Sequence, residues 1–162
     1  MIKPFIIGSV AALGVGVALL FSKSAQANSG TSGDLSGKVS QLANAIAFAE
    51  GFQDRNGNIL QENVPARFHN PGDLGPGDAP GYASESHGGS QIAAFPDDAT
   101  GWKYLTNKVT NILSGKSSVY TLDMTFLQMA SKYAGNSYAW ALNVTDYLSV
   151  NDTMTLREWV NS

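Results

Sequence analysis

Apolar residues recur at helical spacing between residues 35 and 49. They are separated by steps of four and three: Leu35, Val39, Leu42, Ile46 and Ala49. This is the spacing of one face of an amphipathic helix. The pattern stops at Glu50, and Gly51 is well suited to terminate a helix there. We therefore predict a helix that ends at a carboxylate on the margin of its buried face.

A second helix is predicted between Asp97 and Gly115. Either Asp97 or Asp98 can supply the N-cap, and Gly115 marks the end. The buried face has the same spacing as the first helix: Trp102, Leu105, Val109 and Ile112. The two aspartates are therefore interpreted first as capping residues.

Capping boxes indicate two more helix starts near the C-terminus. Thr125 with Gln128 and Thr155 with Glu158 have the spacing that lets cap and third residue bond each other's backbone. Between them, Ser137 opens another helical pattern. The predicted architecture is mainly α.

The chain between these helical regions is irregular. Asn56-Gly57 is a hairpin signal within residues 53–61, so a small irregular or β-hairpin element is expected directly after Glu50. Residues 65–96 are rich in Gly, Pro, Asp and Ser. A stretch of this length is too long for a passive connection in a small domain and usually carries function.

A calcium loop is suggested by the same region but is incomplete. Asp54, Asn56 and Asn58 match the first three ligand positions of such a loop. Ile59 stands where glycine is required, and Glu62 comes too early. We therefore expect no metal site and no cofactor.

The N-terminus has the features of an export segment. Lys3 precedes an apolar run over residues 5–21, and residues 25–27 have the small-x-small form cut by signal peptidase. Cleavage after Ala27 is favoured over an uncleaved membrane anchor. Residues 28–33 are then a linker, and residues 34–162 form one domain. With either outcome we expect an exported protein, periplasmic or extracellular, with membrane association through the N-terminal segment if it is retained.

Composition excludes several classes of function. The chain has no cysteine, so thiol catalysis and cysteine-ligated metals are excluded. Loss of Lys3 and Lys23 from the 10 basic side chains leaves 8 against 13 acidic ones, a net charge of −5. A domain this acidic has no nucleic-acid footprint. Any glycan binding would depend on shape, hydrogen bonds and aromatic contacts.

Glu50 is the leading candidate for chemistry. Burial at the margin of the helix and the negative end of the helix dipole both raise the pKa of a carboxyl group. A proton held near neutral pH is what a general acid needs. A solvated glutamate at a frayed helix end would give the same local pattern.

Several motifs occur in an order that resembles a known superfamily. They are Ala-Ile-Ala-Phe-Ala-Glu-Gly-Phe at residues 45–52, Arg-Phe-His-Asn-Pro-Gly-Asp-Leu at 67–74, Ala-Phe-Pro at 94–96 and Gly-Trp at 101–102. A later match covers residues 124–134. The set is similar to the lysozyme-like superfamily, which includes goose-type lysozymes and lytic transglycosylases, and specifically to bacterial and phage-associated members with an Asn-Pro-Gly-(Asn or Asp)-(Ile or Leu) signature.

The resemblance covers about residues 36–160 and implies an α+β, mainly helical lysozyme-like fold that cleaves peptidoglycan glycan strands. It implies that Glu50 is the catalytic acid. Asp73 is the first candidate for a second catalytic carboxylate, although Asp is also favoured in such a turn for backbone reasons. Further candidates follow in this order: Glu62, Glu85, Asp97 and Asp98. If none faces Glu50, two routes remain. In the transglycosylase route, Glu50 acts first as acid and then as base to a hydroxyl of the substrate; in the other, water attacks with weak assistance.

Three residues are candidates for substrate binding. The amide of Asn70 can bond either its own loop or a sugar, and His69 is a loop histidine that is more usually structural. Tyr133 is similar to the tyrosine that lines the cleft of lytic transglycosylases, but it is equally compatible with a half-buried core position. Two other classes stay open: an inactive lysozyme-fold module that binds glycan or serves structurally in an envelope or virion, and an exported interaction domain without a glycan role.

Overall fold

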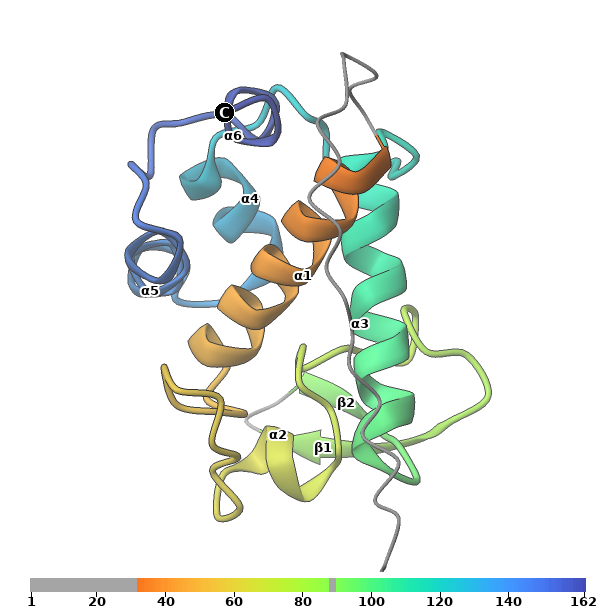
Figure 1. The fold of residues 1–162 in the computed structure, drawn as a ribbon. Coiled ribbons are helices and arrows are strands. Elements are labelled where there is room, and N and C mark those ends of the chain that lie inside the picture. Colours follow the sequence, from red (N-terminus) through yellow and green to blue (C-terminus); the bar gives the residue numbers. More distant parts are fainter. Residues whose placement is uncertain (1–31, 88–89) are drawn as a thin grey trace, which may run out of the picture.

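A computed structural model describes residues 32–87 and 90–162. The described residues form six helices and one two-stranded sheet (Figure 1). In chain order these elements are α1 (Ser32–Ala49), α2 (Val64–Arg67), β1 (Ala83–His87), β2 (Ser90–Ala94), α3 (Asp98–Leu113), α4 (Phe126–Tyr133), α5 (Ser137–Leu148) and α6 (Leu156–Val160). The fold is thus rich in helix with one small antiparallel sheet, as the sequence predicted at this level.

Helix α1 forms the centre of the molecule. It packs against α3 on one side and α5 on the other, and α4 packs against α5 (Figure 1). The predicted apolar face of α1 is inside the core, where Leu42 and Ile46 are fully buried among Leu105, Val109 and Val144. Burial of each such side chain contributes about 1.5–3 kcal/mol. The core therefore fixes the end of α1, and with it the backbone of Glu50.

The caps predicted from the sequence are confirmed. Asp97 is the N-cap of α3 and accepts a 2.7 Å hydrogen bond from the backbone N–H of Thr100. Thr125 and Thr155 each form a complete capping box, at the starts of α4 and α6. Gly115 adopts a left-handed conformation (φ 70°) directly beyond the end of α3, where a residue with a Cβ would be strained.

The sheet lies further along the chain than the sequence indicated. Residues 53–59 contain only an isolated bridge between Gln53 and Ile59, whereas β1 and β2 pair in antiparallel register from Ala83–Ala94 to His87–Ser90. The Asp54 carboxylate explains the irregular segment, because its Oδ1 accepts from the backbone N–H groups of Asn56 and Asn58. Such side-chain bonds compete with a strand ladder.

The expected export segment, residues 1–27, lies outside the described residues, as does most of the expected linker. Helix α1 begins at Ser32, within that linker. Of the helices that the structure describes, none has the length and apolar character needed to cross a membrane.

Candidate active site

Glu50 follows α1 directly and borders a pocket. Its backbone N–H still bonds the carbonyl of Ile46 at 2.9 Å, so the chain keeps its helical course up to this residue. The indole Nε1–H of Trp140, a residue on α5 that is only 4 % exposed, donates a 2.7 Å hydrogen bond to Glu50 Oε1. The pocket has a volume of about 290 Å³ and is lined by Ala49, Glu50, Ala134, Gly135, Asn136, Ala139, Trp140 and Asn143. The partly buried carboxyl group is therefore both held by a donor and open to a small cavity.

Burial raises the pKa of Glu50 from 4.5 to about 7. The Trp140 hydrogen bond acts in the opposite direction because it stabilises the charged carboxylate. The negative charge of Asp73 raises the pKa further, and the positive charge of Lys108 lowers it. The group is consequently divided between its acid and base forms near neutral pH.

Tyr133 lies near this carboxyl group, and its hydroxyl contacts the Pro71–Asp73 loop. Its ring stacks on Trp140 with the centroids 4.8 Å apart and the planes inclined by 23°. Its hydroxyl donates a 2.9 Å hydrogen bond to the carbonyl of Gly72. Burial, followed by the charge of Glu50, raises the pKa of Tyr133 well above its usual value. Tyr133 is therefore a neutral hydrogen-bond donor that ties the end of α4 to the loop.

Lys108 of α3 completes the cluster and, like Trp140, contacts the Tyr133 ring. Its Nζ lies 2.7 Å from Asp78 Oδ2, 4.8 Å from the centre of the Tyr133 ring and 5.6 Å from that of Tyr120. The Lys108 side chain is only 16 % exposed. Ion pairs and cation–π contacts gain strength when they are shielded from water in this way. Lys108 thus joins α3 to the Asp78 loop and to α4.

Asp73 lies in the left-handed region (φ 46°), a conformation that Asp tolerates better than most residues. Its backbone N–H donates to the carbonyl of Asn70 at 3.1 Å. The carboxylate is close enough for its charge to raise the pKa of both Glu50 and Tyr133. Of the residues that the sequence singled out, the structure therefore brings Glu50, Asp73 and Tyr133 into one cluster.

Asn70 supports the loop from inside. It is fully buried, and its Nδ2 donates to the carbonyls of Leu74 and Ala93 at 2.9 Å while its Oδ1 accepts from the N–H of Leu74. The sequence left open whether this amide bonds its own loop or a sugar. In the structure it bonds its own loop. In this conformation Asn70 has no surface to offer a sugar, and we assign it to loop support and not to substrate binding.

His69 is bound to the start of α3. Its Nδ1 lies 2.6 Å from Asp98 Oδ1, and its backbone has a positive φ of 52°. A Cβ at position 101 would overlap its carbonyl oxygen, so the loop approaches α3 at a point where only glycine fits. These contacts indicate a role in packing the loop on α3, and the described contacts of His69 do not extend to Glu50. We do not include it in the site.

The remaining carboxylates considered from the sequence have other surroundings. Asp97 is a helix cap and Asp98 pairs with His69. Glu62 is exposed, and Glu85 is an exposed residue of β1. Among the described residues, no group of three or more His, Cys, Asp or Glu side chains could hold a metal ion.

Sequence reasoning missed Trp140, Lys108 and Asp78. Trp140 belongs to the predicted helix opened by Ser137, where an aromatic residue is normally read as core. Lys108 falls one residue before Val109 on α3 and has the pattern of a solvated position. Only tertiary packing brings Trp140 and Lys108 close enough to act on Glu50, and Asp78 to Lys108. Searches of family models, curated proteins and solved structures found no match to the chain.

Proposed function

We propose that this protein cleaves the glycan strand of peptidoglycan, with Glu50 as general acid and then general base. The observation that carries the proposal is a carboxyl group at the border of a pocket whose burial raises its pKa to about 7. Cleavage of a glycosidic bond needs a proton on the leaving oxygen, and a donor is most effective when its pKa lies near the working pH.

Two routes can complete the reaction after the proton has been transferred. In the first, the carboxylate of Asp73 stabilises the positively charged sugar or activates a water molecule, and the product is a reducing sugar. In the second, Glu50 takes a proton from a hydroxyl of the substrate itself, and the product is a 1,6-anhydro sugar. The charge of Asp73 acts on Glu50, which supports the first route.

The motif order supports the choice of substrate. Glu50 at the end of a core helix, followed by an irregular segment, the Asn70–Leu74 loop and a helical remainder, is the order that resembles the lysozyme-like superfamily. Trp140 lines the pocket beside Glu50, and aromatic contacts are a means of binding sugars that an acidic domain can use. Together with the expected export segment, this favours an exported enzyme of the cell envelope or of a phage.

Replacement of Glu50 by Gln tests the proposal, because it retains the acceptor for Trp140 and removes the transferable proton. Cleavage of purified sacculi should fall by about 10²–10⁴-fold. Loss of turbidity measures the rate, and product analysis separates a reducing end from an anhydro end. Glu85→Gln, at an exposed position on β1, is the matched control and should retain full activity.

Equal activity of the Glu50→Gln variant and the wild type would contradict the role of Glu50. Thermal unfolding of each variant shows whether a lost activity reflects lost folding. A well-folded wild type that binds sacculi without cleaving them would instead support the inactive binding module.

A further inference from the structure

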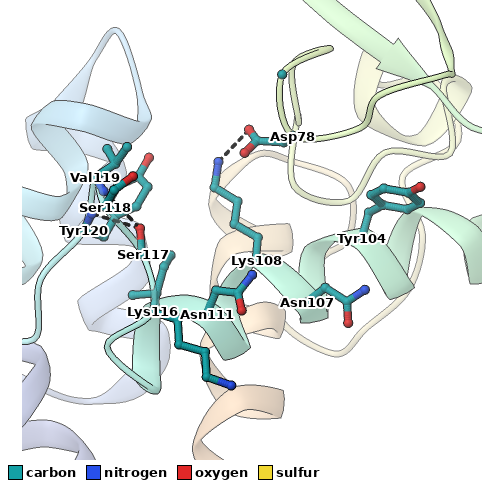
Figure 2. A pocket seen from close by; sticks show the side chains of 12 residues that line it. Asp78, Tyr104, Asn107, Lys108, Asn111, Lys116, Ser117, Ser118, Val119 and Tyr120 are labelled. Carbon is teal, nitrogen blue, oxygen red and sulfur yellow. Dashed lines mark hydrogen bonds and ion pairs between the residues drawn. The ribbon is translucent and has the colours of Figure 1, made fainter.

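A second, larger pocket is lined in part by Lys108. Its volume is about 410 Å³, within the range of roughly 300–1,000 Å³ that is usual for ligand sites. Figure 2 shows it between the exposed side of α3, the segment 116–120 and the loop that carries Asp78. The walls come from three separate parts of the chain, so the pocket depends on the fold as a whole.

The lining is suited to a ligand that carries amide groups. Asn107 and Asn111 lie four residues apart on α3 and line the pocket together (Figure 2). Within the part of the chain that the structure describes, neither side-chain amide makes a hydrogen bond. Each can donate to a carbonyl and accept from an N–H. Tyr104 and Val119 add apolar surface at the two ends.

The pocket also carries an excess of positive charge. Lys108 is neutralised by Asp78 at 2.7 Å, whereas Lys116 has no acidic partner among the described residues. This contrasts with the acidic composition of the domain as a whole. An uncompensated ammonium group in a polar pocket favours a ligand with a carboxylate.

Lys108 links the pocket to Glu50 electrostatically. Its ammonium group lines the pocket, lies over the Tyr133 ring and is close enough to Glu50 to lower the pKa of that carboxyl. Tyr133 in turn stacks on Trp140, which bonds Glu50. Binding of one substrate at both places requires that a strand with its glycosidic bond at Glu50 places a substituent in the pocket.

We propose that this pocket binds the peptide stem that peptidoglycan carries on its glycan strand, through Asn107, Asn111 and Lys116. The assignment rests on the proposed function. A stem peptide supplies backbone amides for the two asparagines and a free carboxylate for Lys116. In a strand that bears all its stems, each sugar carboxylate is used in the amide bond to a stem. The sugars of such a strand therefore offer no anion. The pocket therefore makes the enzyme selective for strands that still bear peptides.

The test compares two substrates: soluble glycan strands with their stem peptides, and the same strands after an amidase has removed the stems and each freed lactyl carboxylate has been converted to its methyl amide. The variant is Asn107→Ala combined with Lys116→Ala, both at exposed positions. The matched control is Lys103→Ala combined with Asn161→Ala, also exposed and outside the pocket. On peptide-bearing strands the pocket variant should show a KM about tenfold higher than wild type, with kcat unchanged. On bare strands the variant, the control and the wild type should be equal.

A second measurement separates this inference from the proposed function. A synthetic stem tetrapeptide is titrated into the labelled protein, and the side-chain amide signals of Asn107 and Asn111 are followed by NMR. Shifts of these signals, lost in the Lys116→Ala protein, support the pocket even for a wild type that cleaves neither substrate. Equal KM values for wild type and pocket variant on peptide-bearing strands, or an absence of shifts, would overturn the inference, whereas a wild type inactive on both substrates overturns the proposed function.

Discussion

The proton affinity of one residue, Glu50, is the balance of burial and three neighbouring side chains. Burial dominates and raises its pKa, Trp140 and Lys108 oppose that rise, and Asp73 adds to it. Because one pKa unit corresponds to 1.36 kcal/mol, modest changes in any neighbour are measurable at Glu50. Single substitutions can thus test the arrangement one contact at a time.

Trp140→Phe should raise the pKa of Glu50 above its wild-type value. The substitution removes the indole donor that stabilises the carboxylate and keeps an aromatic ring to stack on Tyr133. The alkaline limb of the pH–activity profile should move to higher pH with it. NMR titration of the Glu50 carboxyl carbon measures the shift, and Trp102→Phe, whose ring contacts Phe52 instead, is the control. A pKa that falls or stays constant in Trp140→Phe would show that the indole bond is not formed in solution.

Asp73→Asn should lower the pKa of Glu50. Removal of the neighbouring negative charge makes ionisation of Glu50 easier, and Asn tolerates the left-handed backbone of this position. The same NMR titration measures the change. Product analysis on sacculi then shows whether the reducing sugar is lost, as the first of the two routes requires. An unchanged pKa would mean that Asp73 lies further from Glu50 than the structure has it.

At the scale of elements, the start of α3 packs closely on the His69–Asp73 loop. Gly101 is the residue of α3 at this contact. A Cβ at Gly101 would overlap the His69 carbonyl and would also lie 2.8 Å from the ring of Pro71. Both close contacts involve rigid atoms, a carbonyl group and a proline ring. The loop that carries Asp73 therefore keeps its position only while residue 101 has no side chain.

Gly101→Ala should destabilise the protein by about 1–3 kcal/mol, the usual cost of overpacking. Gly37→Ala is the matched control, because that glycine lies in α1 with open space around its Cβ position, and the substitution should stabilise by up to about 1 kcal/mol. Urea unfolding gives both values. A Gly101→Ala protein as stable as the wild type would show that the loop can move away from α3 at no cost.

Sequence patterns predicted what is decided locally. The starts of α3, α4 and α6 depend on Asp97, Thr125 and Thr155, whose partners lie three residues away. The sheet was misplaced because Asn56-Gly57 is a strong turn signal that Asp54 diverts into side-chain bonds, while β1, one strand of the actual sheet, has little apolar alternation.

The candidate site was predicted only in part, because some of its residues are far apart in the sequence. Glu50 was identified because a carboxylate at the end of an apolar helix pattern is unusual in the sequence itself. Trp140 and Lys108 reach it from positions 90 and 58 residues further along the chain. No local pattern encodes such a meeting. Asn70 was ambiguous because an amide can satisfy its bonds inside or outside the protein, and only burial decides between the two.

At the scale of the whole molecule, the raised pKa of Glu50 couples folding to pH. The pKa is 4.5 in an unfolded chain and about 7 in the folded one, so the folded state binds more protons between these values. Stability contributed by the protonated carboxyl is fully present below pH 4.5 and is lost as the pH rises through 7. The loss corresponds to about 3 kcal/mol.

Glu50→Gln should remove this dependence. The free energy of unfolding of the variant, minus that of the wild type, should increase by about 3 kcal/mol between pH 4 and pH 8. Urea unfolding at a series of pH values measures it, and Glu85→Gln should follow the wild type throughout. A constant difference across this range would contradict the raised pKa.

The neighbours of Glu50 do not all have the same freedom to move. Trp140 belongs to the hydrophobic core and holds Glu50 by a hydrogen bond, whereas Asp73 lies in a loop attached by the Tyr133–Gly72 hydrogen bond and the fit at Gly101. Proton uptake at Glu50 and the position of this loop are therefore thermodynamically linked. A ligand that draws Asp73 closer makes Glu50 a weaker acid, and one that pushes it away makes Glu50 a stronger one. The titration curve of a single carboxyl thus reports on the movement of the loop.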